Sequence, residues 1–209
     1  YVEASQLYGV EVSFEIHLLA WQYPKDEDSA KQVDRILAKH KGREVPDKAV
    51  LNRVHRLAGL KLNRYLMQHL PQLAKGRKFK VRRKLGEVYV QILLAEHYFS
   101  KTLKLQQQGV LAQLYGFTKP EQLYQVMQAN HGLDRTLDAR SAVYQLERAN
   151  KKSWLLPNAY RRMALNYKQE GDGKKAAFWW RRLVQRFPEH NHAPEAYWEL
   201  AWYHYDQGG

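Results

Sequence analysis

The 209-residue sequence contains no cysteine, which excludes disulfide bonds, a thiolate nucleophile and thiolate metal ligands. It also has no apolar run near the roughly 18 residues that a membrane-spanning helix needs. A phosphate-binding glycine loop and a nucleophile elbow are both missing, and Glu87, Glu96 and Glu170 lack a partner carboxylate. The sequence therefore indicates no catalytic residues and no cofactor. A self-contained hydrolase or lyase is the least supported alternative.

The beginning of the chain is also unusual, because Tyr1 stands where an initiator methionine would be. The first residues show no signal-peptide pattern. A mature secreted protein and an excised fragment both fit this start, and the sequence does not choose between them.

Basic residues clearly outnumber acidic residues in the composition. Thirty-four Lys and Arg residues stand against 21 Asp and Glu residues, for a formal net charge of +13. Such an excess favours anionic partners through long-range attraction. Nucleic acid, acidic polymers of the cell envelope and membrane surfaces all qualify, while the alternative is that the charge only keeps the protein soluble.

Helical periodicity dominates the chain, so we expect an all-α fold of stacked helical hairpins. Thr118 and Glu121 form a capping box with Pro120 in the first turn, and Gly132 stands where a left-handed helix stop is expected. A further helix opens at Asp28 or Ser29 and is closed by Gly42. The other expected helices are 46–70 with a break or bend at Gly59 and a stop at Pro71, Lys84–Gln106, Leu137–Asn150, Pro157–Glu170, Lys174–Phe187 and Pro194–Gln207.

Residues 8–18 are ambiguous. Tyr8, Val10, Val12 and the apolar residues that follow alternate with polar ones, which is typical of a half-buried strand. A helical stripe through Val10 and Phe14 fits as well, and we favour helix because the rest of the chain is helical.

The segment 160–188 has the pattern of a helical hairpin. Large and small apolar residues recur on one face of each helix, a glycine separates the helices, and a proline ends the second. The small residues Ala164 and Ala176 allow close approach of the two helices. The pattern consists of Tyr160, Met163, Ala164, Tyr167, Gly171, Ala176, Trp180 and Pro188.

These positions resemble the tetratricopeptide repeat, a 34-residue helix–turn–helix unit, with a departure at Leu183, where alanine is usual. Tyr197, Leu200, Ala201 and Gly208 start a second unit, and Ala164 and Ala201 are 37 residues apart. The resemblance implies an α-solenoid that binds a partner protein. It divides the chain into degenerate hairpins at 1–150 and repeats at 151–209, the last one incomplete, so we expect the natural chain to continue or α-helix 194–207 to act as a cap.

The joint at 188–196 is similar to joints in repeats of bacterial envelope proteins. Such proteins include outer-membrane assembly lipoproteins, envelope scaffolds and the superhelical arm of soluble lytic transglycosylases. The resemblance therefore implies a periplasmic or envelope location, with peptidoglycan or a protein as the partner. A cytoplasmic location is the alternative.

A basic cluster follows residue 74 and is the first candidate binding site. Lys and Arg side chains bind phosphate backbones with release of counterions, so region 39–84 is a candidate contact for nucleic acid. Lys61, Asn63 and Arg64 after Gly59 also fit the second helix of a helix-turn-helix. A solvated turn is the other interpretation. The candidate residues are Lys75, Arg77, Lys78, Lys80, Arg82, Arg83 and Lys84, preceded by Arg53, Arg56, Lys61 and Arg64.

Aromatic residues near the end of the chain are the second candidate site. Trp180 occupies a packing position of the repeat, so its neighbour Trp179 is expected to point elsewhere, and Trp198 is likewise next to the packing residue Tyr197. We therefore expect Trp179 and Trp198 to face a ligand. His190 and His192 share a turn, but two histidines fall short of the three or four ligands of a metal site.

Overall fold

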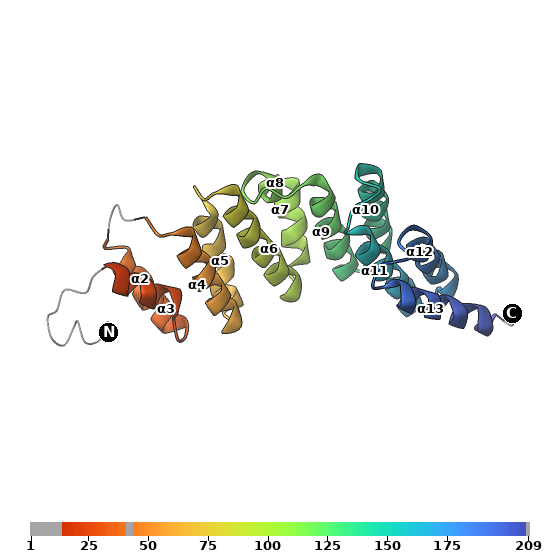
Figure 1. The fold of residues 1–209 in the computed structure, drawn as a ribbon, viewed down its shortest axis with the longest axis horizontal. Coiled ribbons are helices and arrows are strands. Elements are labelled where there is room, and N and C mark those ends of the chain that lie inside the picture. The colour runs from red at the N-terminus through yellow and green to blue at the C-terminus, as the bar shows by residue number, and fades with distance from the viewer. Residues whose placement is uncertain (1–13, 41–43, 208–209) are drawn as a thin grey trace. The chain divides into compact units, whose positions relative to one another are not determined.

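A computed structural model of the protein describes residues 14–40 and 44–207. The chain divides into two compact units, unit 1 with residues 1–92 and 114–116, and unit 2 with residues 93–113 and 117–209. Every regular element in the described ranges is a helix, which confirms the expected all-α fold (Figure 1). Residues 8–13 of the ambiguous segment lie outside the described residues, while the part from Phe14 onward is helical.

Unit 1 is built from helices that pack on their neighbours along the chain. Helix α2 packs on α3 and α4, and α4 packs on α5. The last helix, α6, continues beyond residue 92 into the start of unit 2. The helices are α2 (Phe14–Gln22), α3 (Glu27–Leu37), α4 (Asp47–Gly59), α5 (Asn63–Ala74) and α6 (Phe79–Ala95).

Unit 2 contains two complete helical hairpins, α9 with α10 and α11 with α12, followed by α13, which packs on α12. Helices α7 and α8 cover α9. The helices are α7 (Phe99–Gln107), α8 (Val110–Gln113), α9 (Lys119–Gly132), α10 (Thr136–Ala149), α11 (Leu156–Gln169), α12 (Gly173–Arg186) and α13 (Ala193–Asp206).

The hairpins of unit 2 repeat with a constant spacing. Helices α9, α11 and α13 each have 14 residues, and their first residues are 37 positions apart. Each has a proline in its first turn, at Pro120, Pro157 and Pro194, where the missing N–H costs no hydrogen bond. The regular spacing therefore begins at α9, inside the region 1–150 that the sequence pattern had indicated as degenerate.

Several helix boundaries differ from the predictions. The predicted helix 84–106 is two helices, because the chain turns at His97, which has a left-handed φ of 60°. The start at Asp28 or Ser29 is also wrong. Asp26 is the N-cap, and its carboxylate accepts a hydrogen bond from the Ser29 N–H at 2.8 Å. Pro71 does not end α5, which continues to Ala74.

Two glycines in unit 2 have different roles. Gly171 has a φ of 77° after α11, as expected for a residue that ends a helix in the left-handed region. Gly132 remains helical, and the left-handed residue that follows α9 is Asp134, with a φ of 57°. A Cβ on Gly132 would lie 2.3 Å from the Phe99 ring. Gly132 is therefore required for close packing of α7 on α9 rather than for the turn.

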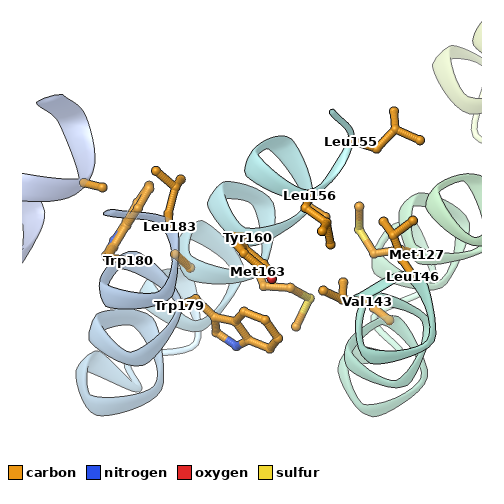
Figure 2. Packing of buried hydrophobic residues seen from close by; sticks show 14 of the residues in the cluster. Met127, Val143, Leu146, Leu155, Leu156, Tyr160, Met163, Trp179, Trp180 and Leu183 are labelled. Atoms are coloured by element: carbon orange, nitrogen blue, oxygen red, sulfur yellow. The ribbon is translucent and has the colours of Figure 1, made fainter. Parts of the chain in front are cut away.

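The core of unit 2 combines leucine, valine and alanine side chains with the aromatic rings of Tyr160, Trp179 and Trp180 (Figure 2). Trp179 and Tyr160 lie between α11 and α12 with ring centroids 5.7 Å apart. The carboxylate of Glu147 is buried beside them and accepts hydrogen bonds from Arg182 at 2.6–2.9 Å, and from Arg186 and the Tyr160 hydroxyl. This charged network joins α10, α11 and α12.

Candidate partner-binding face

The first helices of the hairpins, α9, α11 and α13, together form a surface that we call the first-helix face. Ion pairs hold α11 and α13 together on it. The Arg161 guanidinium donates two hydrogen bonds to Glu195, at 2.5 and 2.8 Å. The Lys168 ammonium lies 2.8 Å from both carboxylate oxygens of Glu199. The guanidinium of Arg161 lowers the pKa of Glu195, so this pair is charged at neutral pH.

A polar hollow of about 300 Å³ lies on this face between α9 and α11. Burial lowers the pKa of His131 on one wall, and the charge of Arg162 on the opposite wall lowers it further. Burial raises the pKa of the Tyr124 hydroxyl, so tyrosine and histidine are both neutral there at pH 7. The hollow is lined by Tyr124, His131, Asn158, Arg161, Arg162, Leu165, Asn166 and Gln169.

An exposed aromatic cluster lies on α13, the last helix of the face. Trp198, which the sequence predicts to bind a partner, is 64% exposed, and Trp202 and Tyr205 are 53% and 73% exposed. Ring centroids of Trp198 and Trp202 are 6.2 Å apart, and those of Trp202 and Tyr205 are 5.6 Å apart. These side chains and Ala201 border a hollow of about 330 Å³.

Trp202 and Tyr205 belong to the aromatic group near the end of the chain, but only Trp179 and Trp198 of that group were predicted to face a ligand. Their spacing from Trp198, four and seven residues on, is the spacing that places side chains on one face of a helix. That signal is present in the sequence.

The prediction that Trp179 faces a ligand is wrong. Its side chain is almost completely buried, with its ring close to Tyr144 and Tyr160. Trp180 next to it is also buried. Helix α12 lies between α11 and α13, so neighbouring positions on it face two different helices, and both tryptophans belong to the core.

Arg53, predicted to bind an anionic partner, is instead buried among α2, α3, α4 and α5. Its guanidinium donates to the carboxylate of Asp34 at 2.9 Å and to the Trp21 carbonyl. It also lies 3.2 Å from the hydroxyl of Tyr65. Burial and the hydrogen bond to Asp34 raise the pKa of Tyr65 to about 12. Arg53 holds unit 1 together and is not available to a partner.

Three arginines of the predicted basic cluster also make contacts within unit 1. Arg77 donates to the carbonyl of Val45 and lies 3.3 Å from the carboxylate of Asp47. Arg82 donates to the carbonyl of Leu114 at 3.2 Å. Arg83 lies 3.5 Å from Glu87, one turn further along α6. These contacts explain why the segment 77–83 is not simply a solvated turn.

The remaining basic candidates of unit 1 are exposed. Lys80 and Lys84 are one turn apart on α6, and Lys61 follows the end of α4 with a left-handed φ of 57°. Gly59 ends α4 before α5 begins, so the predicted break is confirmed. The exposed set is Arg56, Lys61, Arg64, Lys75, Lys78, Lys80 and Lys84.

No cluster of three or more potential metal ligands occurs within residues 14–40 and 44–207. His192 Nε2 lies 2.8 Å from the Asn158 side-chain oxygen, so this histidine joins the α11–α13 interface. In the same described ranges no helix combines the length and apolarity needed to cross a membrane.

Comparison of the chain with known protein families and with curated proteins finds no match. Comparison of its fold with solved structures finds none either.

Proposed function

We propose that this protein is a non-catalytic interaction scaffold of tetratricopeptide type that binds a partner polypeptide on its first-helix face. The exposed aromatic cluster on α13 carries the proposal. Trp198, Trp202 and Tyr205 contact one another around a hollow, yet each is more than half exposed. Contiguous exposed apolar surface on a protein usually marks an interaction site. Tryptophan and tyrosine dominate the binding energy of protein interfaces.

The polar hollow adds specificity to the proposed site. Tetratricopeptide-like hairpins stack so that their first helices form one extended surface, and the polar hollow between α9 and α11 lies on it. The aromatic hollow lies on α13, where Trp198 and Tyr205 are at the positions that Arg161 and Lys168 have on α11. A partner segment that contacts α13 through apolar side chains would therefore have polar and cationic groups within reach on α9 and α11.

A location in the bacterial cell envelope belongs to the same proposal. Its support is the segment 188–196, which includes the turn between α12 and α13 and the first residues of α13. More specifically, we propose that the chain is the non-catalytic arm of a lytic transglycosylase and that it associates with peptidoglycan. Co-sedimentation with purified peptidoglycan sacculi tests it, and the protein should pellet with the sacculi in moderate salt.

The test of partner binding is selection of peptides from a random displayed library on the intact protein. Selected peptides are then titrated by fluorescence polarisation against Trp198→Ala and Trp202→Ala. Loss of a hot-spot tryptophan at an interface costs about 2 kcal/mol or more, which is more than tenfold in affinity. Trp154 is the matched control, because it is 70% exposed in the turn before α11. Trp154→Ala should change affinity less than twofold.

Two outcomes of this experiment would contradict the proposed peptide-binding site. Enrichment of no peptide over the empty support would count against a peptide-binding face. Peptides that bind equally well to Trp202→Ala and to the unchanged protein would place the site elsewhere.

Nucleic-acid binding by unit 1 is the second candidate function, favoured by the exposed lysines of the basic cluster. Lys80→Glu with Lys84→Glu removes two exposed charges from one face of α6 and spares the anchored arginines. Fluorescence anisotropy with a labelled duplex, titrated over salt, should then show weaker binding and a shallower salt slope. The control is Lys151→Glu with Lys152→Glu, an equal charge change in unit 2. Equal effects of both pairs would mean only non-specific attraction.

A further inference from the structure

The interface between α11 and α13 pairs cations with anions in a regular way. Lys168 on α11 contacts Glu199 on α13, and Arg161 contacts Glu195. Each cation projects from the side of α11 that faces the next first helix, and each carboxylate projects back from α13. Because the first helices repeat every 37 residues, the same positions can be compared at the preceding interface.

At the interface between α9 and α11, the equivalent positions carry no carboxylate. His131 occupies the position of Lys168, and Arg162 occupies the position of Glu199. An ion pair is thus replaced by two groups that are both basic. At the second pair of positions, Tyr124 replaces Arg161 and the neutral Asn158 replaces Glu195. The polar hollow lies at this place.

Nearby acids do not supply the missing charge. Glu170 accepts hydrogen bonds from Thr136 at 2.5 Å and from Asn166 at 3.0 Å. Glu170 and Asp134 both favour the protonated form of His131, yet burial and Arg162 outweigh them and its pKa is lowered. Within the described part of the chain, Arg162 makes no ion pair, and its neighbour Arg161 is paired with Glu195.

We infer that the hollow between α9 and α11 binds a compact oxyanion, a carboxylate or a phosphate, carried by the partner. The anion lies between His131 and Arg162 and supplies the negative charge that Glu199 supplies opposite Lys168 at the next interface. The Arg162 guanidinium offers paired N–H donors that match two oxygens of such a group, and the His131 ring and the Asn158 and Gln169 amides supply further donors. A hollow of about 300 Å³ has room for the anion together with part of its carrier.

This inference rests on the proposed function only in assigning the anion to a partner. The site itself is testable with small anions, so its failure is distinguishable from failure of the peptide-binding proposal. Anion binding should raise the pKa of His131, because a negative charge within a few ångströms stabilises the imidazolium.

The experiment is NMR titration of the intact protein, following the His131 imidazole over pH in sodium chloride, sodium phosphate or sodium acetate at equal ionic strength. The His131 signal is assigned by its loss in His131→Gln. Phosphate and acetate are separate arms, and the arm with the larger pKa rise identifies the preferred oxyanion. A saturable rise relative to chloride is expected in at least one arm.

Variants test whether the anion-induced rise in the His131 pKa depends on Arg162. Arg162→Gln should weaken anion binding at least tenfold, whereas Lys168→Gln, which removes an equal charge from the paired position on the same helix, should leave it within twofold. Arg162→Glu supplies the missing carboxylate and should raise the His131 pKa without any added anion. Equal His131 pKa values in chloride, phosphate and acetate would overturn the inference, as would an anion response that persists in Arg162→Gln.

Discussion

Replacement of Glu147 by glutamine should destabilise unit 2 substantially, because this carboxylate is the common acceptor of the α10–α11–α12 network. The side chain is 9% exposed and accepts from Arg182, Arg186 and the Tyr160 hydroxyl. Glu147→Gln keeps the shape and one oxygen acceptor. It removes the charge and turns the second acceptor into a donor that faces the guanidinium of Arg182.

The magnitude follows from the exposure of the partners. Leaving a fully buried charge unpaired costs about 3–5 kcal/mol. Arg182 and Arg186 are about one third exposed, so water compensates part of the loss. Hydrogen bonds to charged groups contribute about 1.5–3 kcal/mol each. We therefore expect a decrease in the free energy of unfolding of about 2–3 kcal/mol.

Glu87→Gln is the matched control, since it makes the same chemical change in an exposed pair with Arg83 on α6. Such a pair is worth about 0.3–0.5 kcal/mol. The assay is urea unfolding followed by tryptophan fluorescence, because five of the six tryptophans lie in unit 2, and by circular dichroism, which also reports the helices of unit 1 that include Glu87. The urea midpoint should fall clearly for Glu147→Gln and hardly change for Glu87→Gln.

The pH dependence provides an independent check. Burial alone would raise the pKa of Glu147, but hydrogen bonds from Arg182 and Tyr160 outweigh it, and the pKa lies below its ordinary value of 4.5. A depressed carboxyl pKa contributes stability that is complete above the unfolded-state pKa and is lost as pH falls through the folded-state pKa. The gap between Glu147→Gln and the unchanged protein should be constant from neutral pH to about 5 and narrow below it. Equal midpoints for the two variants at pH 7, or a gap that persists at pH 3, would refute the reasoning.

Two further predictions concern unit 1. Gly86→Ala would place a Cβ 2.5 Å from the Cβ of buried Tyr115, and overpacking of this kind costs about 1–3 kcal/mol. A Cβ at Gly59 meets nothing within 4 Å, so Gly59→Ala should gain up to about 1 kcal/mol from helix propensity. The melting temperatures of the two variants, measured by circular dichroism, should shift in opposite directions, and equal shifts would contradict the packing argument. Arg53→Lys loses the guanidinium whose two Nη atoms donate to Asp34 and to the Trp21 carbonyl at the same time. It should lower stability by about 2 kcal/mol, seen as an earlier urea transition of Trp21, the single tryptophan of unit 1. An unchanged transition would mean that one donor suffices.

Features that depend on nearby residues were predicted well. The capping box of Thr118 and Glu121 is confirmed, with the Thr118 N–H 2.8 Å from the glutamate carboxylate. The left-handed Gly171 is also confirmed. The last four helices were predicted to within one residue at each end, because caps, prolines and apolar periodicity all act over one or two turns.

Residues whose roles depend on distant partners were not predicted. Arg53 has the sequence context of a surface arginine, but residues 19 to 32 positions earlier surround its guanidinium. The position of Trp179 next to the packing residue Trp180 predicts that its side chain points away from the core, but α12 packs on both α11 and α13, so both positions are covered. No glycine or proline near His97 signals the break between α6 and α7, so that turn was missed as well.

The sequence by itself determined the helical class, the hairpins after residue 150 and a basic surface, since period, caps and charge are properties of local composition. Only the tertiary structure decided which basic and aromatic residues remain accessible. Burial and ion pairing are set by packing between helices that are far apart in the sequence. Adjacent residues such as Arg161 and Arg162 can therefore differ in whether they have a carboxylate partner. One is neutralised by Glu195 across the repeat, and the other faces a hollow with no carboxylate at the equivalent position.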